Sequence, residues 1–131
     1  KKDKNWLIRR SENKNMIIYT AQYGYKGKDR LDITVKTGDK TFAPTWDMVM
    51  GYKNGTLSDE QYTKMYINLL RNSYKKNRKR WEEILNCEQV TFVCFCAHGK
   101  FCHRLILANV FTKLGATYKG EVDRTWIKLI K

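Results

Sequence analysis

Gln89-Val-Thr-Phe-Val-Cys-Phe95 is the strongest strand signal in the chain, and the segment Cys96-Ala-His-Gly-Lys-Phe101 follows it directly. The first stretch is apolar on both faces, as a central strand of a parallel sheet must be. Downstream, residues 105–114 carry apolar side chains at helical spacing and end at Gly115, a residue typical of helix C-termini. A short strand at residues 116–118 then completes a strand–helix–strand unit, which predicts a parallel sheet.

Upstream of this unit, the pattern predicts two more strands. Residues 15–20 form a short apolar run between polar neighbours, typical of a buried first strand. Residues 31–35 alternate apolar and polar side chains, which indicates a second, half-exposed strand. Between them, residues 23–29 combine two glycines with aromatic and cationic side chains. This stretch is expected to be a flexible loop that can close over a ligand.

Two helical segments are predicted between these strands and Gln89. Pro44 suits the first turn of a short helix that includes Trp46. Ser58 followed by Gln61 is a capping-box pattern, so a long helix is expected from Asp59 to about residue 85, with a break near residue 77. The predicted fold class is therefore α/β, a small Rossmann-like domain with a mostly parallel sheet flanked by helices.

Size and composition favour one domain in a soluble protein. The chain has 131 residues, of which 42% are hydrophobic, enough for one core and too few for two. We expect a single domain over residues 1–131, with residues 1–14 and 124–131 peripheral. No apolar run is long enough to span a bilayer, and the N-terminus lacks the apolar stretch of a signal peptide. A cytoplasmic protein without membrane contact is expected.

The charge predicts partners that carry phosphate. Lys and Arg number 26 against 13 Asp and Glu, a formal net charge of +13, and such a positive field attracts nucleotides and nucleic acids. In the most basic stretch, residues 64–80, every charged residue is a lysine or an arginine. Two interpretations of this stretch stay open, a solvated helix surface and a contact with a phosphate backbone.

The loop between the strand and the helix is the candidate site. In open α/β sheets, ligands bind outside the carboxyl ends of the strands, and residues 96–102 occupy that position. The N-terminus of the following helix favours an anion, which Lys100 and Arg104 would contact. The same helix terminus lowers the pKa of a cysteine placed there, and a neighbouring cationic His103 would lower it further, so Cys102 is a candidate thiolate.

Three chemistries are open for the cysteines of this segment. In the first, Cys96 or Cys102 acts as a nucleophile while His98 or His103 transfers protons. In the second, a zinc ion binds to Cys94, Cys96, Cys102 and one of the two histidines. In the third, these side chains only pack and cap the helix. Without a secretion signal, the cysteines are poor evidence for a disulfide framework.

The block from Val93 to Ala108 resembles the signature of an uncharacterised bacterial and phage family. That family is a domain of unknown function marked by C-x-C followed by C-H-R, and the similarity extends upstream to residues 31–34, 42–47 and 52–53. The resemblance implies a compact α/β fold and cysteine-based enzymatic activity, without naming a reaction. It carries over a functional cluster of Cys94, Cys96, Cys102, His103 and Arg104, with Asp32, Thr45, Trp46, Asp47 and Lys53 as further candidates.

The leading expectation is a protein that binds a phosphate-containing ligand at residues 96–104 and performs cysteine-dependent catalysis on it. Asp32 is a candidate general acid or base, and Trp46 could stack a base together with Tyr23 or Tyr25. The alternative is a module that binds nucleic acid or a protein partner and has a structural or zinc-binding cysteine cluster. A phage origin would add a third function, removal of a nucleotide signal of host defence.

Overall fold

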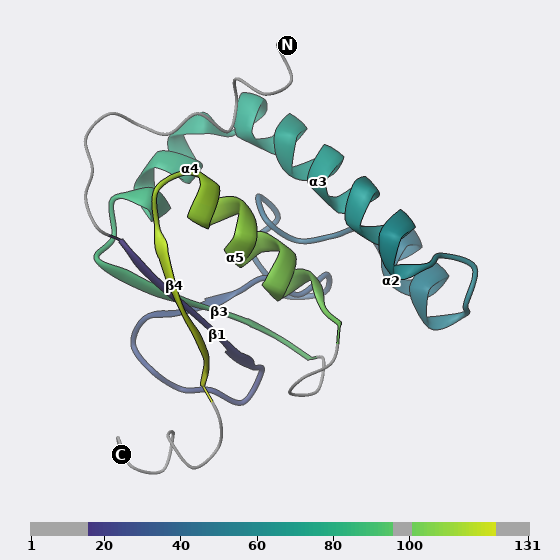
Figure 1. Ribbon diagram of the computed structural model, residues 1–131, viewed down its shortest axis with the longest axis horizontal. Helices are drawn as coiled ribbons and strands as arrows, with labels where there is room; N and C mark the ends of the chain where they lie inside the picture. Colours follow the sequence, from purple (N-terminus) through teal and green to yellow (C-terminus); the bar gives the residue numbers. More distant parts are fainter. Residues whose placement is uncertain (1–15, 96–100, 123–131) are drawn as a thin grey trace.

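A parallel four-stranded sheet forms the centre of the molecule (Figure 1). The computed structural model describes residues 16–95 and 101–122. The strands are β1 (Ile17–Gln22), β2 (Arg30–Asp32), β3 (Gln89–Cys94) and β4 (Thr117–Val122), in the order β2-β3-β1-β4. All three strand pairs are parallel. The prediction of an α/β fold with a parallel sheet is confirmed.

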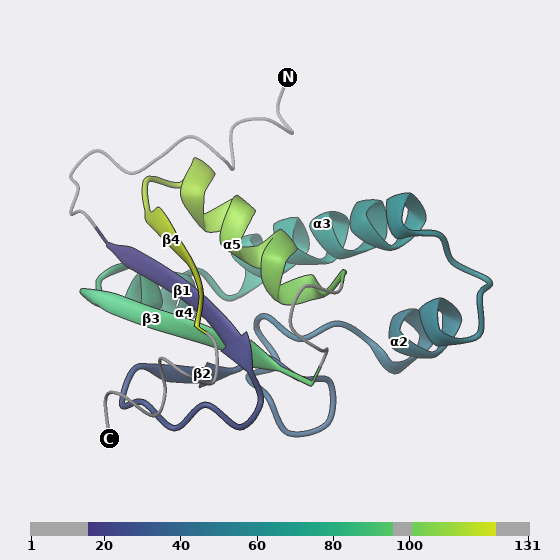
Figure 2. The same ribbon diagram turned by 60° about the horizontal axis from the view of Figure 1, so that its bottom comes forward.

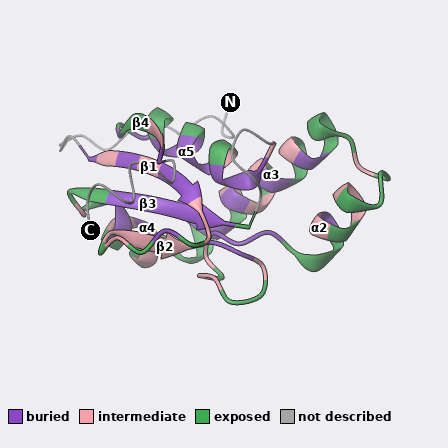
Figure 3. Cartoon of the chain, turned by 90° about the horizontal axis from the view of Figure 1, so that it is seen from below, coloured by how far each residue is buried: buried purple, intermediate pink, exposed green. Residues whose placement is uncertain are grey.

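β3 lies inside the sheet, between β2 and β1, and five of its six residues are buried. It pairs with β1 on one side, where Gln22 lies opposite Cys94, and with β2 on the other, where Leu31 lies opposite Phe92. Figure 3 shows that β1 and β3 are largely buried. This burial explains the continuous apolar run of the sequence, since a central parallel strand is covered on both faces.

Four helices occur in the described residues: α2 (Trp46–Lys53), α3 (Asp59–Lys76), α4 (Arg78–Leu85) and α5 (His103–Lys113). Ser58 caps α3 through the predicted capping box with Gln61, because each side chain accepts from the other residue's backbone N–H. Asn77 separates α3 from α4, so the predicted break in the long helix is confirmed. None of the described helices combines the length and the apolar character needed to cross a membrane.

Helices α3, α4 and α5 pack against one face of the sheet (Figure 2). The connections from β2 to β3 and from β3 to β4 move in the same direction across the sheet, so right-handed crossovers put their helices on the same side. Trp81 of α4 stacks on Phe111 of α5 with ring centroids 5.4 Å apart, and Phe111 meets the edge of Phe92 of β3. These rings bind both crossovers to the central strand.

The opposite face of the sheet is covered by the connection from β1 to β2. Tyr25 is buried there and donates a 2.6 Å hydrogen bond to Asp29. Asp29 in turn accepts a hydrogen bond from Thr91 of β3. Residues 23–29, which the sequence predicts as a flexible loop over a ligand, are therefore tied to the sheet by hydrogen bonds in their described conformation.

Three predicted strands have other boundaries in the structure. The first strand, expected at residues 15–20, spans Ile17–Gln22. The second strand ends at Asp32, not residue 35, because the Asp32 carboxylate accepts hydrogen bonds from the backbone and hydroxyl of Thr34 and from the hydroxyl of Thr37. Such side-chain bonds stabilise a turn in place of a strand. The last strand extends to Val122, beyond the predicted residue 118, because it pairs with β1 past a bulge.

Candidate functional site

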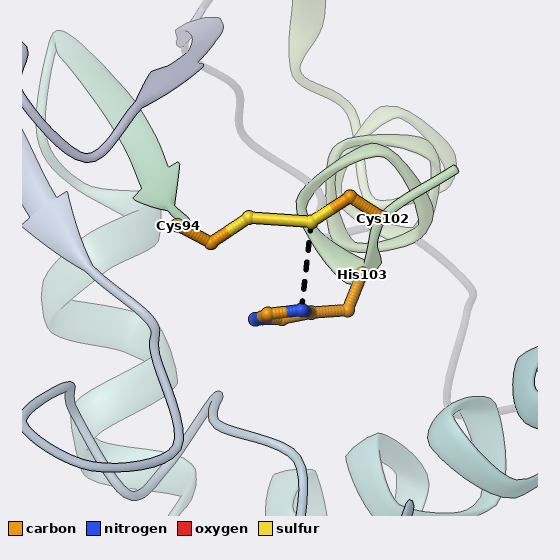
Figure 4. A group of neighbouring side chains, drawn as sticks. All are labelled: Cys94, Cys102 and His103. Carbon is orange, nitrogen blue, oxygen red and sulfur yellow. Dashed lines mark hydrogen bonds between the residues drawn. A yellow bond between two sulfur atoms is a disulfide. The ribbon is translucent and has the colours of Figure 1, made fainter. Parts of the chain in front are cut away.

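The candidate site lies where β3 ends and α5 begins (Figure 4). Cys94 is the last residue of β3, and Cys102 is the N-cap of α5. Their sulfur atoms are in bonding contact, as a disulfide, while their Cα atoms are 7.9 Å apart. Both side chains are almost fully buried. This pairing was not predicted from the sequence, which brings the two cysteines to one site and leaves the bond between them open.

The Cα separation bears on the state of these cysteines. Disulfides usually span about 4.4–6.8 Å between Cα atoms, and the value here is 7.9 Å. The bonded pair therefore joins the ends of β3 and α5 across a longer Cα separation than most disulfides have.

His103 follows Cys102 and has a defined tautomer. Its Nε2 lies 2.8 Å from the carbonyl oxygen of Ile33, and a carbonyl only accepts, so Nε2 carries the proton. Nδ1 is therefore an acceptor, and it lies 3.7 Å from the Cys102 sulfur. Burial lowers the pKa of His103 to about 4, with a smaller contribution from the nearby Arg104 charge. At neutral pH the ring is an uncharged base, in contrast to the cationic neighbour that the sequence suggested.

Arg104 is the next residue along α5, and its side chain is completely buried. Its guanidinium donates to both carboxylate oxygens of Glu121 on β4, at 3.1 and 2.6 Å. A further N–H donates to the Cys94 sulfur at 3.0 Å. Glu121 also accepts a hydrogen bond from Thr20 of β1. Arg104 thus connects α5, β4 and the end of β3, and it is not among the described residues that line the neighbouring cavity.

A cavity of about 220 Å³ opens beside the two cysteines. Its walls are mainly apolar and aromatic, and Lys36 and Lys53 are among the lining residues. Trp46 and Phe95 are more than half exposed, at 54% and 67%, so both present open ring surface next to the cavity. The described lining residues are Thr34, Val35, Lys36, Trp46, Val49, Tyr52, Lys53, Tyr62, Cys94, Phe95, Phe101, Cys102 and His103.

The structure brings some of the predicted ligand-binding residues to this cavity and places others elsewhere. Trp46 and Lys53 line it. Tyr23 lies beside it, stacked on Phe95 with ring centroids 4.2 Å apart. Thr45 caps α2, because its hydroxyl accepts from the backbone of Met48.

Three other predicted residues are not among the described lining residues. Tyr25 packs on the opposite face of the sheet, where burial and its bond to Asp29 raise its pKa to about 12. Asp47 is exposed in the first turn of α2. Asp32 holds the turn after β2, and although burial opposes its charge, hydrogen bonds from Thr37 and Thr34 lower its pKa. The Asp32 carboxylate forms the turn after β2 in this structure, and its role as a general acid or base stays a prediction.

Three predicted site residues, Cys96, His98 and Lys100, lie outside the described residues. Sequence reasoning also missed functional candidates. Three of them line the cavity: Lys36 from the turn after β2, Tyr52 from α2 and Tyr62 from α3. The fourth, Glu121 of β4, binds the guanidinium of Arg104. A signal existed only for Tyr52, which is part of the upstream similarity at residues 52–53.

Several cations of the basic stretch 64–80 are paired with acids. Arg80 contacts Asp39 at 2.8 Å and Glu83 at 3.1 Å, and Arg78 contacts Glu82 at 3.3 Å. These pairs favour the interpretation of a solvated helix surface for this part of the stretch, whereas Lys75, Lys76 and Lys79 are exposed. Contact of this stretch with a phosphate backbone stays a prediction.

The buried neutral His103 predicts a loss of stability in weak acid. Its pKa is about 4 in the folded chain and 6.5 in an unfolded one, so between these values the unfolded chain binds more protons. Stability from this group is complete above pH 6.5 and is lost as the pH falls to 4, by up to about 3 kcal/mol. Urea denaturation at several pH values measures this slope. His103→Gln should flatten it, and an equally steep slope in that variant would contradict the assignment.

These features define a class: an α/β protein with a cysteine–histidine site at the carboxyl end of a central parallel strand. The family model DUF488-N3a, described as the active DUF488-N3 subclade, matches residues 3–115. The chain belongs to this family, which supports the expected membership of a domain-of-unknown-function family. Neither a curated protein nor a solved structure gives a significant match to the chain.

Proposed function

We propose that the chain is an enzyme that uses Cys102 as a nucleophile on a phosphate-containing substrate, a nucleotide or a nucleic acid. One observation carries this proposal. The unprotonated Nδ1 of His103 lies 3.7 Å from the Cys102 sulfur, and both residues line the cavity. A nucleophile beside a base that a third group orients is the general arrangement of covalent catalysis. Here the Ile33 carbonyl is the orienting group.

The proposed reaction begins with the reduced site, in which Cys102 is a thiol beside the neutral His103. As the Cys102 sulfur attacks an electrophilic atom of the substrate, its proton moves to Nδ1 of His103. The imidazolium then returns the proton to the leaving group, and water later releases the second product from the sulfur. The hydrogen bond to Ile33 supports the ring in its charged state, because a carbonyl oxygen stabilises an N–H cation. The matched family's description as an active subclade agrees with catalysis.

The walls of the cavity support the proposed substrate class. Exposed ring surface of Trp46 and Phe95 suits stacking on a nucleobase, and Lys36 and Lys53 supply charge for a phosphate. The net charge of +13 would raise the local concentration of such a substrate. The apolar character of the walls also excludes bulk water from the sulfur, which favours attack on a bound group.

Binding tests the substrate class. Fluorescent AMP and a short fluorescent single-stranded DNA are titrated into the chain and into Lys36→Gln, Lys53→Gln and Trp46→Ala. Each variant is expected to weaken binding of one or both probes about tenfold, whereas Lys113→Gln, an exposed cation at the end of α5, serves as the matched control. If the unmodified chain, the three cavity variants and the control variant bound the probes with equal affinity, the cavity would be rejected as the binding site.

Turnover tests the nucleophile. A mixture of nucleotides and oligonucleotides is incubated with the chain and with Cys102→Ser, and products are identified by mass spectrometry. We expect products that require Cys102 and a covalent intermediate that denaturation traps in the unmodified chain. A trapped adduct on Cys87, or products that Cys102→Ser still forms at the full rate, would reject the assignment.

A second candidate function rests on the same cluster. The ligand atoms of Cys94, Cys102 and His103 all lie within 4.8 Å of one another, and thiolates with an imidazole are a donor set that zinc prefers. In this alternative, a zinc ion stabilises a module that binds nucleic acid or a protein partner. Stoichiometric zinc in the purified chain, lost together with stability in Cys102→Ser, would favour the zinc module over the free nucleophile.

A further inference from the structure

The least expected feature of the site is the pairing of Cys94 with Cys102. We infer that these residues form a dithiol–disulfide couple that exchanges two electrons with small disulfides entering through the cavity. The inference adds a redox activity to the proposed catalysis and does not depend on any phosphate-containing substrate. Three observations carry it: the sulfur contact, the access from the cavity and the environment of each sulfur.

The two sulfurs belong to different elements of the fold and contact each other. Cys94 ends a strand of the central sheet and Cys102 begins a helix that packs on it, so the fold itself brings the sulfurs into bonding contact. Such contact is a requirement for intramolecular exchange, because the second sulfur must lie close enough to attack the mixed disulfide formed on the first. Cys87 lies apart from this pair, on the segment after α4, and is free.

The cavity provides the path for a co-reactant. Both cysteines are at most 2% exposed, yet both line the cavity of about 220 Å³. A small aliphatic disulfide fits an apolar and aromatic cavity of this size. A large protein partner does not, because neither sulfur reaches the outer surface.

Each sulfur also has its own polar partner. Cys102 has the Nδ1 of His103 at 3.7 Å, and Cys94 accepts a hydrogen bond from the fully buried guanidinium of Arg104 at 3.0 Å. A guanidinium donor stabilises negative charge on sulfur. The site thus has a base for one sulfur and a cation for the other, an arrangement that a disulfide with a purely structural role does not require.

The exchange would convert the protein dithiol to a disulfide in two steps. Cys102 transfers its proton to His103, and its sulfur attacks an external disulfide, R–S–S–R, which releases one R–S⁻ and leaves a mixed disulfide on Cys102. The Cys94 sulfur then attacks Cys102 and releases the second R–S⁻. The protein dithiol is oxidised, the external disulfide is reduced to two thiols, and the two thiolates take up the two protons from the cysteines. The reverse sequence reduces the protein again.

The experiment treats the reduced full chain with bis(2-hydroxyethyl) disulfide in the presence of a metal chelator. Remaining thiols are then alkylated, and the peptides are mapped by mass spectrometry. We expect a linked Cys94–Cys102 peptide that dithiothreitol removes, with Cys87 alkylated. Cys94→Ser should stop at a mixed disulfide on Cys102, whereas Cys87→Ser should form the same link as the unmodified chain.

Other outcomes would overturn the inference. These are complete alkylation of Cys94 and Cys102 after the oxidant, a link from Cys102 to any other cysteine, or a link between two chains. Protection of Cys94 and Cys102 from alkylation that is seen only when the chelator is left out would assign the cluster to a metal instead. Because the mapping needs no nucleotide, failure of the link leaves the proposed catalysis by Cys102 standing, and failure to find turnover leaves the couple standing.

Discussion

Replacing Arg104 by leucine is expected to lower the free energy of unfolding by about 3–5 kcal/mol. The guanidinium is completely buried, and it donates to both oxygens of the Glu121 carboxylate and to the Cys94 sulfur. Leucine would remove the guanidinium from the carboxylate of Glu121, whose side chain is only 13% exposed. Breaking one side of a buried ion pair is costly, because the remaining charge loses the interaction that offset its desolvation. Urea denaturation of the reduced protein measures the loss.

The matched control separates the ion pair from the packing. Glu121→Leu should also destabilise the chain, because it removes the carboxylate from the buried guanidinium of Arg104, although Thr20 keeps its contact with Tyr118. The double variant with leucine at both positions should recover at least half of the loss, since both charges of the pair are then removed. Equal losses in the single and double variants would show that packing of Arg104, and not its charge pairing, dominates.

The fold could be predicted to a large extent because its signals are local. The apolar run of β3 and the capping box of Ser58 with Gln61 depend on adjacent residues, and both predicted elements are confirmed. The strand limits could not be predicted, since they depend on partners. β2 stops where Asp32 binds Thr34, and β4 continues because β1 lies beside it. The alternation of apolar residues in the sequence indicates neither the turn at Asp32 nor the pairing of β4 with β1.

The site could be located but not assembled from the sequence. Cys102 and His103 are neighbours, and their position after a parallel strand predicts a site there. Their chemistry, however, depends on groups far along the chain: the Ile33 carbonyl is 70 positions from His103. Glu121 likewise takes the guanidinium of Arg104, which the sequence alone assigns to a ligand. Long-range hydrogen bonds of this kind have no signal in a single sequence.

The burial of His103 also bears on how the cysteine is expected to react. A helix N-terminus and an adjacent cation would give a standing thiolate, and the sequence suggests this picture. The structure instead pairs Cys102 with a neutral imidazole, because burial lowers the pKa of His103 to about 4. In the proposed catalysis, the reactive thiolate then arises only when the Cys102 thiol transfers its proton during attack. Loss of the base is therefore expected to matter more than loss of a nearby charge.

His103→Gln is expected to slow the reaction of Cys102 with iodoacetamide at pH 7 by about 10²-fold, the lower end of the usual contribution of a general base. Glutamine can still donate a hydrogen bond to the Ile33 carbonyl from its terminal amide, so the local fold is preserved. It cannot accept the proton that Nδ1 of His103 accepts from the Cys102 sulfur, 3.7 Å away. The rate is measured on the fully reduced chain by mapping the alkylated peptides over time.

Cys87 provides the internal control for this measurement, because it is free and half-buried and lies before β3, whereas His103 begins the helix that follows β3. Its alkylation rate should be the same in the unmodified chain and in His103→Gln, which would show that the variant keeps its structure. Equal rates for Cys102 in the two proteins would remove His103 as the base and leave the helix N-terminus as the activating group. A parallel fall at Cys87 would instead point to a change in folding, and circular dichroism distinguishes the two cases. With the fold intact, only the loss at Cys102 agrees with transfer of its proton to His103, the step on which the proposed catalysis depends.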